Sequence, residues 1–176
     1  VSAIETLENI QKDYPENFSV LEAVIQTYLD AYKLEDAQRE LLNSAQSKFS
    51  LSAEYASLMA NFYLKKSNVV LASKWFLEAT SRDPLRDEDY YKQGKMLMRM
   101  NKFEQAKKYI FEALKLDPKN ENYVIAFAEI LFESNPDSSI GYLLDHIEKN
   151  GESTKLLAEV AVLFHRSGQL KEFEKF

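Results

Sequence analysis

Small and large apolar residues recur along this chain at a step close to 34 residues. One column runs through Ala3, Ala37, Ala72 and Ala106, at steps of 34, 35 and 34 residues. A column of large apolar residues keeps the same steps, at Leu7, Leu41, Phe76, Ile110 and Leu144. A third column holds mostly small residues and a fourth holds large ones, at Ile25, Ala60, Gly94, Ala128 and Ala161 and at Tyr28, Tyr63, Leu97, Leu131 and Phe164. Because these columns drift together, composition cannot explain them, and we expect an array of structural repeats.

Within each repeat the apolar residues follow helical spacing. Phe103, Ala106 and Ile110, for example, lie three and four residues apart, which places them on one face of a helix. Pro84 and Pro118 follow such segments, and a residue before proline is biased out of the helical region. The pattern predicts helices over residues 2–13, 18–31, 35–48, 53–66, 69–82, 87–100, 103–116, 121–134, 138–149, 154–167 and 170–176.

One insertion and one deletion explain every departure from a step of 34 residues. The extra residue lies between Ser44 and Ala60 and the missing one between Ile147 and Ala161, so both fall in polar segments between repeats. We therefore expect a single array. It comprises the second helix of a truncated repeat (1–17), three repeats (18–52, 53–86 and 87–120), a divergent repeat (121–153) and a truncated repeat (154–176).

The phase of the alanine column predicts that both ends of the chain cut through a repeat. Ala3 and Phe173 both occupy this column, which belongs to second helices. The chain is accordingly interpreted as a fragment of a longer array, in which neighbouring helices would cover the terminal apolar residues. The residues expected to be left uncovered are Leu7 and Ile10 at one end and Leu170, Phe173 and Phe176 at the other.

The columns of small residues indicate close contact between the two helices of a pair. A residue without a large side chain lets two helix backbones approach, and the large residue a few positions on fills the space beside the contact. Gly94 lies in the middle of a predicted helix, where glycine is less favourable than alanine by about 1 kcal/mol. Its presence there predicts that a larger side chain would not fit against the Ala106 column.

These residues resemble the tetratricopeptide repeat family, whose unit is a 34-residue helix-turn-helix with small residues in both helices and a closing proline. The best matching repeat carries Tyr90, Gly94, Leu97, Ala106, Ile110, Ala113 and Pro118. The resemblance implies an all-α fold, a right-handed α-solenoid of antiparallel helix pairs, whose first helices line a concave groove that binds peptides or partner helices. The pattern with which chaperone-binding members of the family hold a carboxylate is absent, so chaperone tails are not expected as ligands.

Charge narrows the classes of partner. The formal net charge is −6, whereas nucleic-acid binders usually carry a basic face, so DNA and RNA are disfavoured. No apolar run is long enough to span a membrane. There is no cysteine, which excludes disulfides and thiol chemistry in this segment. The absence of cysteine suits the cytoplasm and also the periplasm, so the compartment stays open.

A basic stripe is predicted on the first helix of the repeat 87–120. Lys92, Lys95 and Arg99 lie three and four residues apart and so share one helix face. The other candidate groove residues are Asn61 and Lys65 one first helix earlier, Tyr91 beside the stripe and Glu129 one first helix later. One interpretation is that an acidic segment docks on this stripe; the other is an ordinary solvated helix face.

Catalytic, metal and cofactor sites are not expected. His146 and His165 lack a second histidine at helical spacing, and we assign both to surface or packing roles. The four glycines form no phosphate-binding loop. Trp75 lies off the repeat columns, so it is expected either on the convex face or at a joint between repeats, where it could anchor a partner.

The sequence therefore favours a non-catalytic scaffold that binds a peptide or partner protein in its groove. Two alternatives stay open. The segment could be the regulatory or substrate-docking array of a larger enzyme or sensor, or it could self-assemble through its uncovered ends. Fold alone does not decide among the three.

Overall fold

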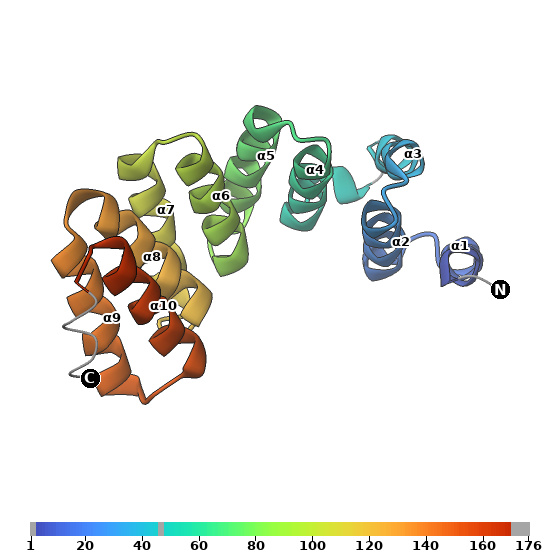
Figure 1. The fold of residues 1–176 in the computed structure, drawn as a ribbon. Coiled ribbons are helices and arrows are strands. Elements are labelled where there is room, and N and C mark those ends of the chain that lie inside the picture. The colour runs from blue at the N-terminus through green and yellow to red at the C-terminus, as the bar shows by residue number, and fades with distance from the viewer. Residues whose placement is uncertain (1–2, 46–47, 170–176) are drawn as a thin grey trace. The chain divides into compact units, whose positions relative to one another are not determined.

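The structure is a computed structural model that describes residues 3–45 and 48–169 (Figure 1). Within these ranges lie ten α-helices and one 3-10 turn: α1 (Ala3–Asp13), α2 (Phe18–Asp30), α3 (Leu34–Ser44), η1 (Lys48–Leu51), α4 (Ala53–Lys65), α5 (Val69–Arg82), α6 (Asp87–Arg99), α7 (Phe103–Leu116), α8 (Glu121–Ser134), α9 (Pro136–Asn150) and α10 (Thr154–Arg166). The chain divides into two compact units, Val1–Asp89 and Tyr90–Phe176, and each is described by itself.

The expected all-α fold of consecutive helix pairs is confirmed. The first helices of the pairs are α2, α4, α6, α8 and α10, and the second-helix column runs through α1, α3, α5, α7 and α9. Every helix boundary lies within two residues of its predicted position, except the end of α3. The helix predicted over 170–176, with Leu170, Phe173 and Phe176, lies outside the described residues.

The end of α3 corrects the sequence prediction. The helix was expected to reach residue 48 but ends at Ser44, seven residues after Ala37, whereas α5 and α7 end ten residues after Ala72 and Ala106. The hydroxyl of Ser44 donates to the backbone oxygens of Glu40 and Leu41, and a serine that bonds back in this way competes with the helical ladder. The inserted residue therefore lies in a longer connection between α3 and α4, as its expected location allows.

The missing residue of the fourth repeat has a simpler effect. Three residues, Gly151 to Ser153, connect α9 to α10, whereas four connect α5 to α6 and α7 to α8. The deletion thus shortens a connection and leaves the helices at full length.

Most turns within a pair use the same left-handed residue. This residue has a φ of 54° at Tyr32, 57° at Ser67, 57° at Asn101 and 76° at Gly168. The next N–H in each turn donates back to a carbonyl of the first helix, and the acceptors are Tyr28, Tyr63, Leu97 and Phe164. All four acceptors belong to one repeat column, so the column marks the carbonyl that closes each helix.

The pair α8 and α9 turns differently, because Asn135 serves both helices. Its N–H donates to the Leu131 carbonyl at 2.8 Å and closes α8, and its side-chain oxygen accepts from the N–H of Ser138 at 3.0 Å and opens α9. Pro136 takes the first position of α9, where it forfeits no helical hydrogen bond. The helix therefore begins at Pro136, two residues before its predicted start.

The core of the first unit lies between successive helices. Ile25, Leu29 and Ala37 are fully buried, and α1 adds Ile4 and Leu7 to the same cluster. Leu7, predicted to be uncovered, is in fact partly buried against this cluster, whereas Ile10 is exposed.

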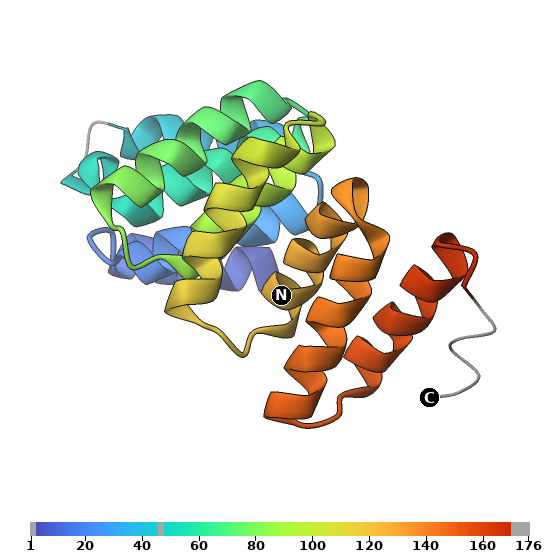
Figure 2. The ribbon, with the colours of Figure 1, turned by 90° about the vertical axis from the view of Figure 1, so that its left-hand side faces the viewer.

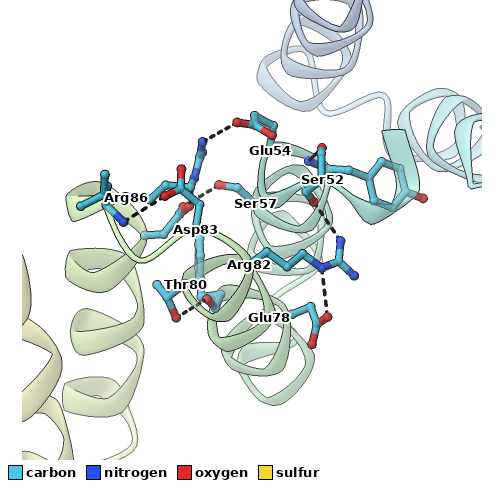
Figure 3. A network of polar contacts seen from close by, with 12 residues as sticks. Ser52, Glu54, Ser57, Glu78, Thr80, Arg82, Asp83 and Arg86 are labelled. Atoms are coloured by element: carbon cyan, nitrogen blue, oxygen red, sulfur yellow. Dashed lines mark hydrogen bonds and ion pairs between the residues drawn. The ribbon is translucent and has the colours of Figure 1, made fainter. Parts of the chain in front are cut away.

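A polar network around Arg82 joins α5 to the connection before α4 (Figure 3). One guanidinium nitrogen donates to the backbone oxygens of Ser50 and Ser52, at 2.9 and 2.8 Å. Another donates to the Glu78 carboxylate at 3.0 Å. The network supplies partners for carbonyls in the irregular segment that follows α3, which helical hydrogen bonds would otherwise satisfy.

A buried carboxylate holds the first turn of α6 in the first unit. Asp89 is 1% exposed, and it accepts hydrogen bonds from the Ser57 hydroxyl at 2.6 Å and from Arg86 at 2.5 Å. Arg86 also reaches Glu54 of α4 at 3.2 Å (Figure 3). The acidic start of α6, predicted as a helix-dipole signal, thus also connects α6 to α4.

The second unit contains two apolar clusters. One includes Leu97, Ala106 and Ile110, and the other surrounds Leu143 and Val160, which are almost completely buried. Figure 2 shows α9 and α10 side by side, in orange and red. Neighbouring helices of the unit therefore bury one face after another along the chain.

Candidate functional site

Part of the predicted basic stripe lies on one exposed side of α6 in the second unit. Lys92 and Lys95 are half-buried, and Arg99 is exposed. The apolar side of the same helix faces the core, where Leu97 is 5% exposed. The helical period that buries Leu97 therefore leaves these three cations at the surface.

Lys95 faces the next first helix. Its ammonium group donates to the Glu129 carboxylate of α8 at 2.8 Å, and the two side chains are 34% and 31% exposed. Glu129, predicted as an acidic neighbour of the stripe, is thus the direct partner of one of its lysines. Because both side chains remain a third exposed, the pair is accessible to solvent and its net contribution to stability is small.

Two more polar contacts join α8 to α10. The Lys155 ammonium donates to the Asn122 side-chain oxygen at 2.5 Å, and Arg166 lies 3.6 Å from the Glu133 carboxylate. Arg166 also stacks over the Phe132 ring, 4.2 Å from its centroid. A row of polar side chains therefore crosses α6, α8 and α10, which we call the first-helix surface. Its ionic and amide members are Lys92, Lys95, Arg99, Asn122, Glu129, Glu133, Lys155, Glu159 and Arg166.

Glu159 is the half-buried carboxylate of this surface. Burial raises the pKa of Glu159 above its ordinary value, and the nearby Glu129 carboxylate raises it further. Arg166 and Lys95 oppose this increase. Acidic and basic groups of three successive first helices therefore influence one another electrostatically.

Tyr91 lies beside the stripe but contributes mainly to packing. Its ring is half-buried and lies 5.0 Å from the ring of Tyr123, centroid to centroid. It joins the cluster formed by α6, α7 and α8. The structure therefore places this predicted site residue at the edge of the core.

Asn61 and Lys65 belong to the first unit, on α4. Asn61 is half-buried. The Lys65 ammonium lies 3.6 Å from the Asp30 carboxylate of α2 and 5.0 Å from the centroid of the Tyr32 ring. As with Lys95, a lysine on one first helix meets a carboxylate on a neighbouring first helix.

The sequence held a signal for these contacts that the search for a basic stripe missed. The paired positions lie one repeat step apart: 34 residues separate Lys95 from Glu129, and 33 separate Asn122 from Lys155 and Glu133 from Arg166. Equivalent positions on successive first helices are neighbours in a stacked array. Opposite charges one step apart could therefore have been predicted to meet.

Other kinds of site find little support in the described part of the chain. No group of three or more histidine, cysteine, aspartate or glutamate side chains there could hold a metal ion. None of the described helices has the length and apolar character needed to cross a membrane. His146 bonds to Asn150 on its own helix, and burial lowers the pKa of His146.

Comparison with known proteins identifies one repeat and the fold. Residues 90–120 match the family model of the tetratricopeptide repeat. This span contains the repeat that the sequence pattern matched best. Curated protein sequences give no match to the chain.

Solved structures of tetratricopeptide repeat proteins share the fold. A protein from Parabacteroides merdae has a TM-score of 0.76 at 17% identity, over 98% of this chain and 69% of that one. A thermophilic protein from Thermus thermophilus has a TM-score of 0.71 at 15% identity, over 92% and 89%. YrrB, described as having an unusual peptide-binding site, has a TM-score of 0.71 at 15% identity, over 95% and 86%. At these identities the likeness establishes the fold.

Proposed function

We propose that this chain, which has the tetratricopeptide repeat fold and a matching repeat at residues 90–120, is a non-catalytic module that binds an acidic polypeptide segment. Proteins built from this repeat are generally protein-interaction modules, and one structure with the same fold, YrrB, is described as having a peptide-binding site. The proposed ligand lies along the first helices, on a groove to which Asn61 and Lys65 of the first unit and Tyr91, Lys92, Lys95, Arg99 and Glu129 of the second contribute.

The observation that carries this proposal is the charge of the first-helix surface. Its nine members include five cations and three carboxylates, although the formal net charge of the whole chain is −6. A local excess of positive charge on an acidic protein attracts acidic segments and repels basic ones. The pair of Lys95 and Glu129 gives the surface a way to discriminate, because a ligand carboxylate must compete with Glu129 for the Lys95 ammonium.

The test measures the binding of synthetic peptides that differ in net charge. We expect an acidic peptide to bind at least tenfold more tightly than a basic one of equal length. Replacing Lys92, Lys95 and Arg99 together by glutamate should lower the affinity for the acidic peptide at least tenfold, about 1.4 kcal/mol or more. The melting temperature should change little, because all three side chains lie at the surface.

A matched control separates the surface from overall charge. Lys102, Lys108 and Lys119 are exposed and lie outside the first helices, so their replacement by glutamate changes the net charge equally. This control should retain acidic-peptide binding within about a factor of three, which corresponds to the small energies of exposed charges. Equal loss of binding in both triple variants would rule out the first-helix surface as the site.

A single substitution tests the competition directly. Glu129→Gln removes the carboxylate that engages Lys95, so it should raise the affinity for the acidic peptide by about twofold to fivefold. Unchanged affinity would show that Lys95 does not contact the ligand.

A further inference from the structure

The early end of α3 leaves an apolar pocket in the first unit. The cavity has a volume of about 280 Å³ and lies between α3, α4 and α5. Ala45 and Ser50, on either side of the missing helical turn, form part of its edge. The insertion that interrupts the repeat step thus coincides with a hollow on the side of the second helices.

The pocket is lined mainly by aromatic and aliphatic side chains. Its inner walls are Leu41, Tyr55 and Phe62, all less than 5% exposed. The Tyr55 hydroxyl already donates to the Leu41 carbonyl at 2.9 Å, so its ring remains as an apolar surface. Trp75 closes one side, with its ring edge-on to Tyr55 at 6.5 Å between centroids. Such walls suit an aromatic ring, which can pack edge to face against them.

A single cation marks the mouth of this pocket. The Lys66 ammonium lies 3.5 Å from the Gln38 side-chain oxygen and 5.2 Å from the centroid of the Phe62 ring, and both residues line the pocket. None of the described residues that line it is acidic. A ligand with an apolar body therefore gains most if its polar end is an anion.

The geometry points to a binding site for a small aromatic carboxylate, with its ring between Trp75, Tyr55 and Phe62 and its carboxylate at Lys66. A cavity of about 150 Å³ holds one benzene molecule in another protein. The volume of about 280 Å³ therefore has room for a ring and a short acidic arm. This site is separate from the first-helix surface, because its walls come largely from the opposite sides of the helices.

The test uses phenylacetate as the probe, with phenylacetamide as its neutral counterpart. Trp75 is the only tryptophan of the chain, so its fluorescence reports the pocket without a label. Phenylacetate should change this fluorescence saturably, with a dissociation constant in the millimolar range or tighter, and phenylacetamide should bind about fivefold more weakly. Equal affinities for the two probes, or no saturable change with phenylacetate, would overturn the proposal.

Two neighbouring lysines provide a matched pair of variants. Lys66→Gln should weaken phenylacetate binding about fivefold and leave phenylacetamide unchanged. Lys65→Gln, one residue away, should alter neither, because the Lys65 ammonium lies beside Asp30. If both substitutions have the same effect, the carboxylate does not bind at Lys66.

A third variant fills the pocket. Ala45 is exposed at the end of α3, so Ala45→Leu should keep the fold, as circular dichroism can verify, yet abolish phenylacetate binding. Retained binding in the folded variant would place the probe elsewhere. A peptide with phenylalanine beside aspartate that binds at least tenfold more tightly than phenylacetate would make the pocket a protein-docking site and overturn the assignment to a small molecule.

Discussion

At the scale of single residues, Gly94 shows how closely the helices of a pair approach. A Cβ atom at this position would lie 2.5 Å from Cδ1 and 2.6 Å from Cγ1 of Ile110, and 3.4 Å from the Ala106 oxygen. Real Cβ atoms do not come so near to other carbons, and Ile110 is fully buried. The glycine is therefore required by packing, although it weakens the helix that contains it.

Gly94→Ala should destabilise the protein despite the better helix propensity of alanine. Overpacking costs about 1 to 3 kcal/mol, whereas the propensity gain is about 1 kcal/mol, so a net loss of up to about 2 kcal/mol is expected. Urea denaturation measures it. Gly141 in α9 is the matched control, because nothing lies within 4 Å of its Cβ position, and Gly141→Ala should stabilise by up to about 1 kcal/mol. Equal shifts in both variants would contradict the packing argument.

The residue scale also shows the limits of prediction from sequence. The role of Gly94 could be predicted, because a repeat column fixes which residues face one another. The contact of Lys95 with Glu129 could have been anticipated from their spacing, but its 2.8 Å geometry depends on rotamers that no column specifies. The pocket around Trp75 could not be predicted, because it depends on where α3 stops, and helix ends are the least certain feature of a pattern.

At the scale of helices and turns, the repeated element is a turn with one left-handed residue. Gly168 adopts this conformation without a steric penalty, whereas Tyr32, Ser67 and Asn101 do so with a side chain. For residues with a Cβ atom the left-handed region costs about 1 to 2 kcal/mol, and asparagine tolerates it better than most. Three turns therefore carry local strain that the packing of their helices must offset.

Ser67→Gly should relieve this strain and stabilise the protein by about 1 kcal/mol. Asn101→Gly should give a smaller gain, because asparagine is already tolerated there. Ser81→Gly, in the last turn of α5, should instead destabilise by about 0.5 to 1 kcal/mol. Thermal unfolding of the three variants supplies the comparison, and a loss of stability in Ser67→Gly would show that its side chain makes a contact that outweighs the strain.

At the scale of the whole molecule, stability is distributed between neighbours. The core residues of each compact unit pack against adjacent helices, and no central core gathers distant segments within the described ranges. In such arrays stability is approximately a sum over repeats and their interfaces. A local defect should therefore weaken one part of the chain more than the rest.

Two matched cavities test this locality by amide hydrogen exchange. Leu29 in the first unit and Leu143 in the second are both fully buried. Each leucine-to-alanine change should cost about 2 to 5 kcal/mol. Leu143→Ala should accelerate exchange mainly in α8 to α10, and Leu29→Ala mainly in α2 to α4. A uniform acceleration along the chain in both variants would instead indicate one cooperative unit.

The shared cap at Asn135 distinguishes one helix pair from the others. In the other pairs separate residues end the first helix and begin the second, so a change at one end leaves the other in place. At Asn135 a single side chain and its own backbone do both. A missense change at this position would erase a stop signal and a start signal together, so drift at this one codon is constrained twice over.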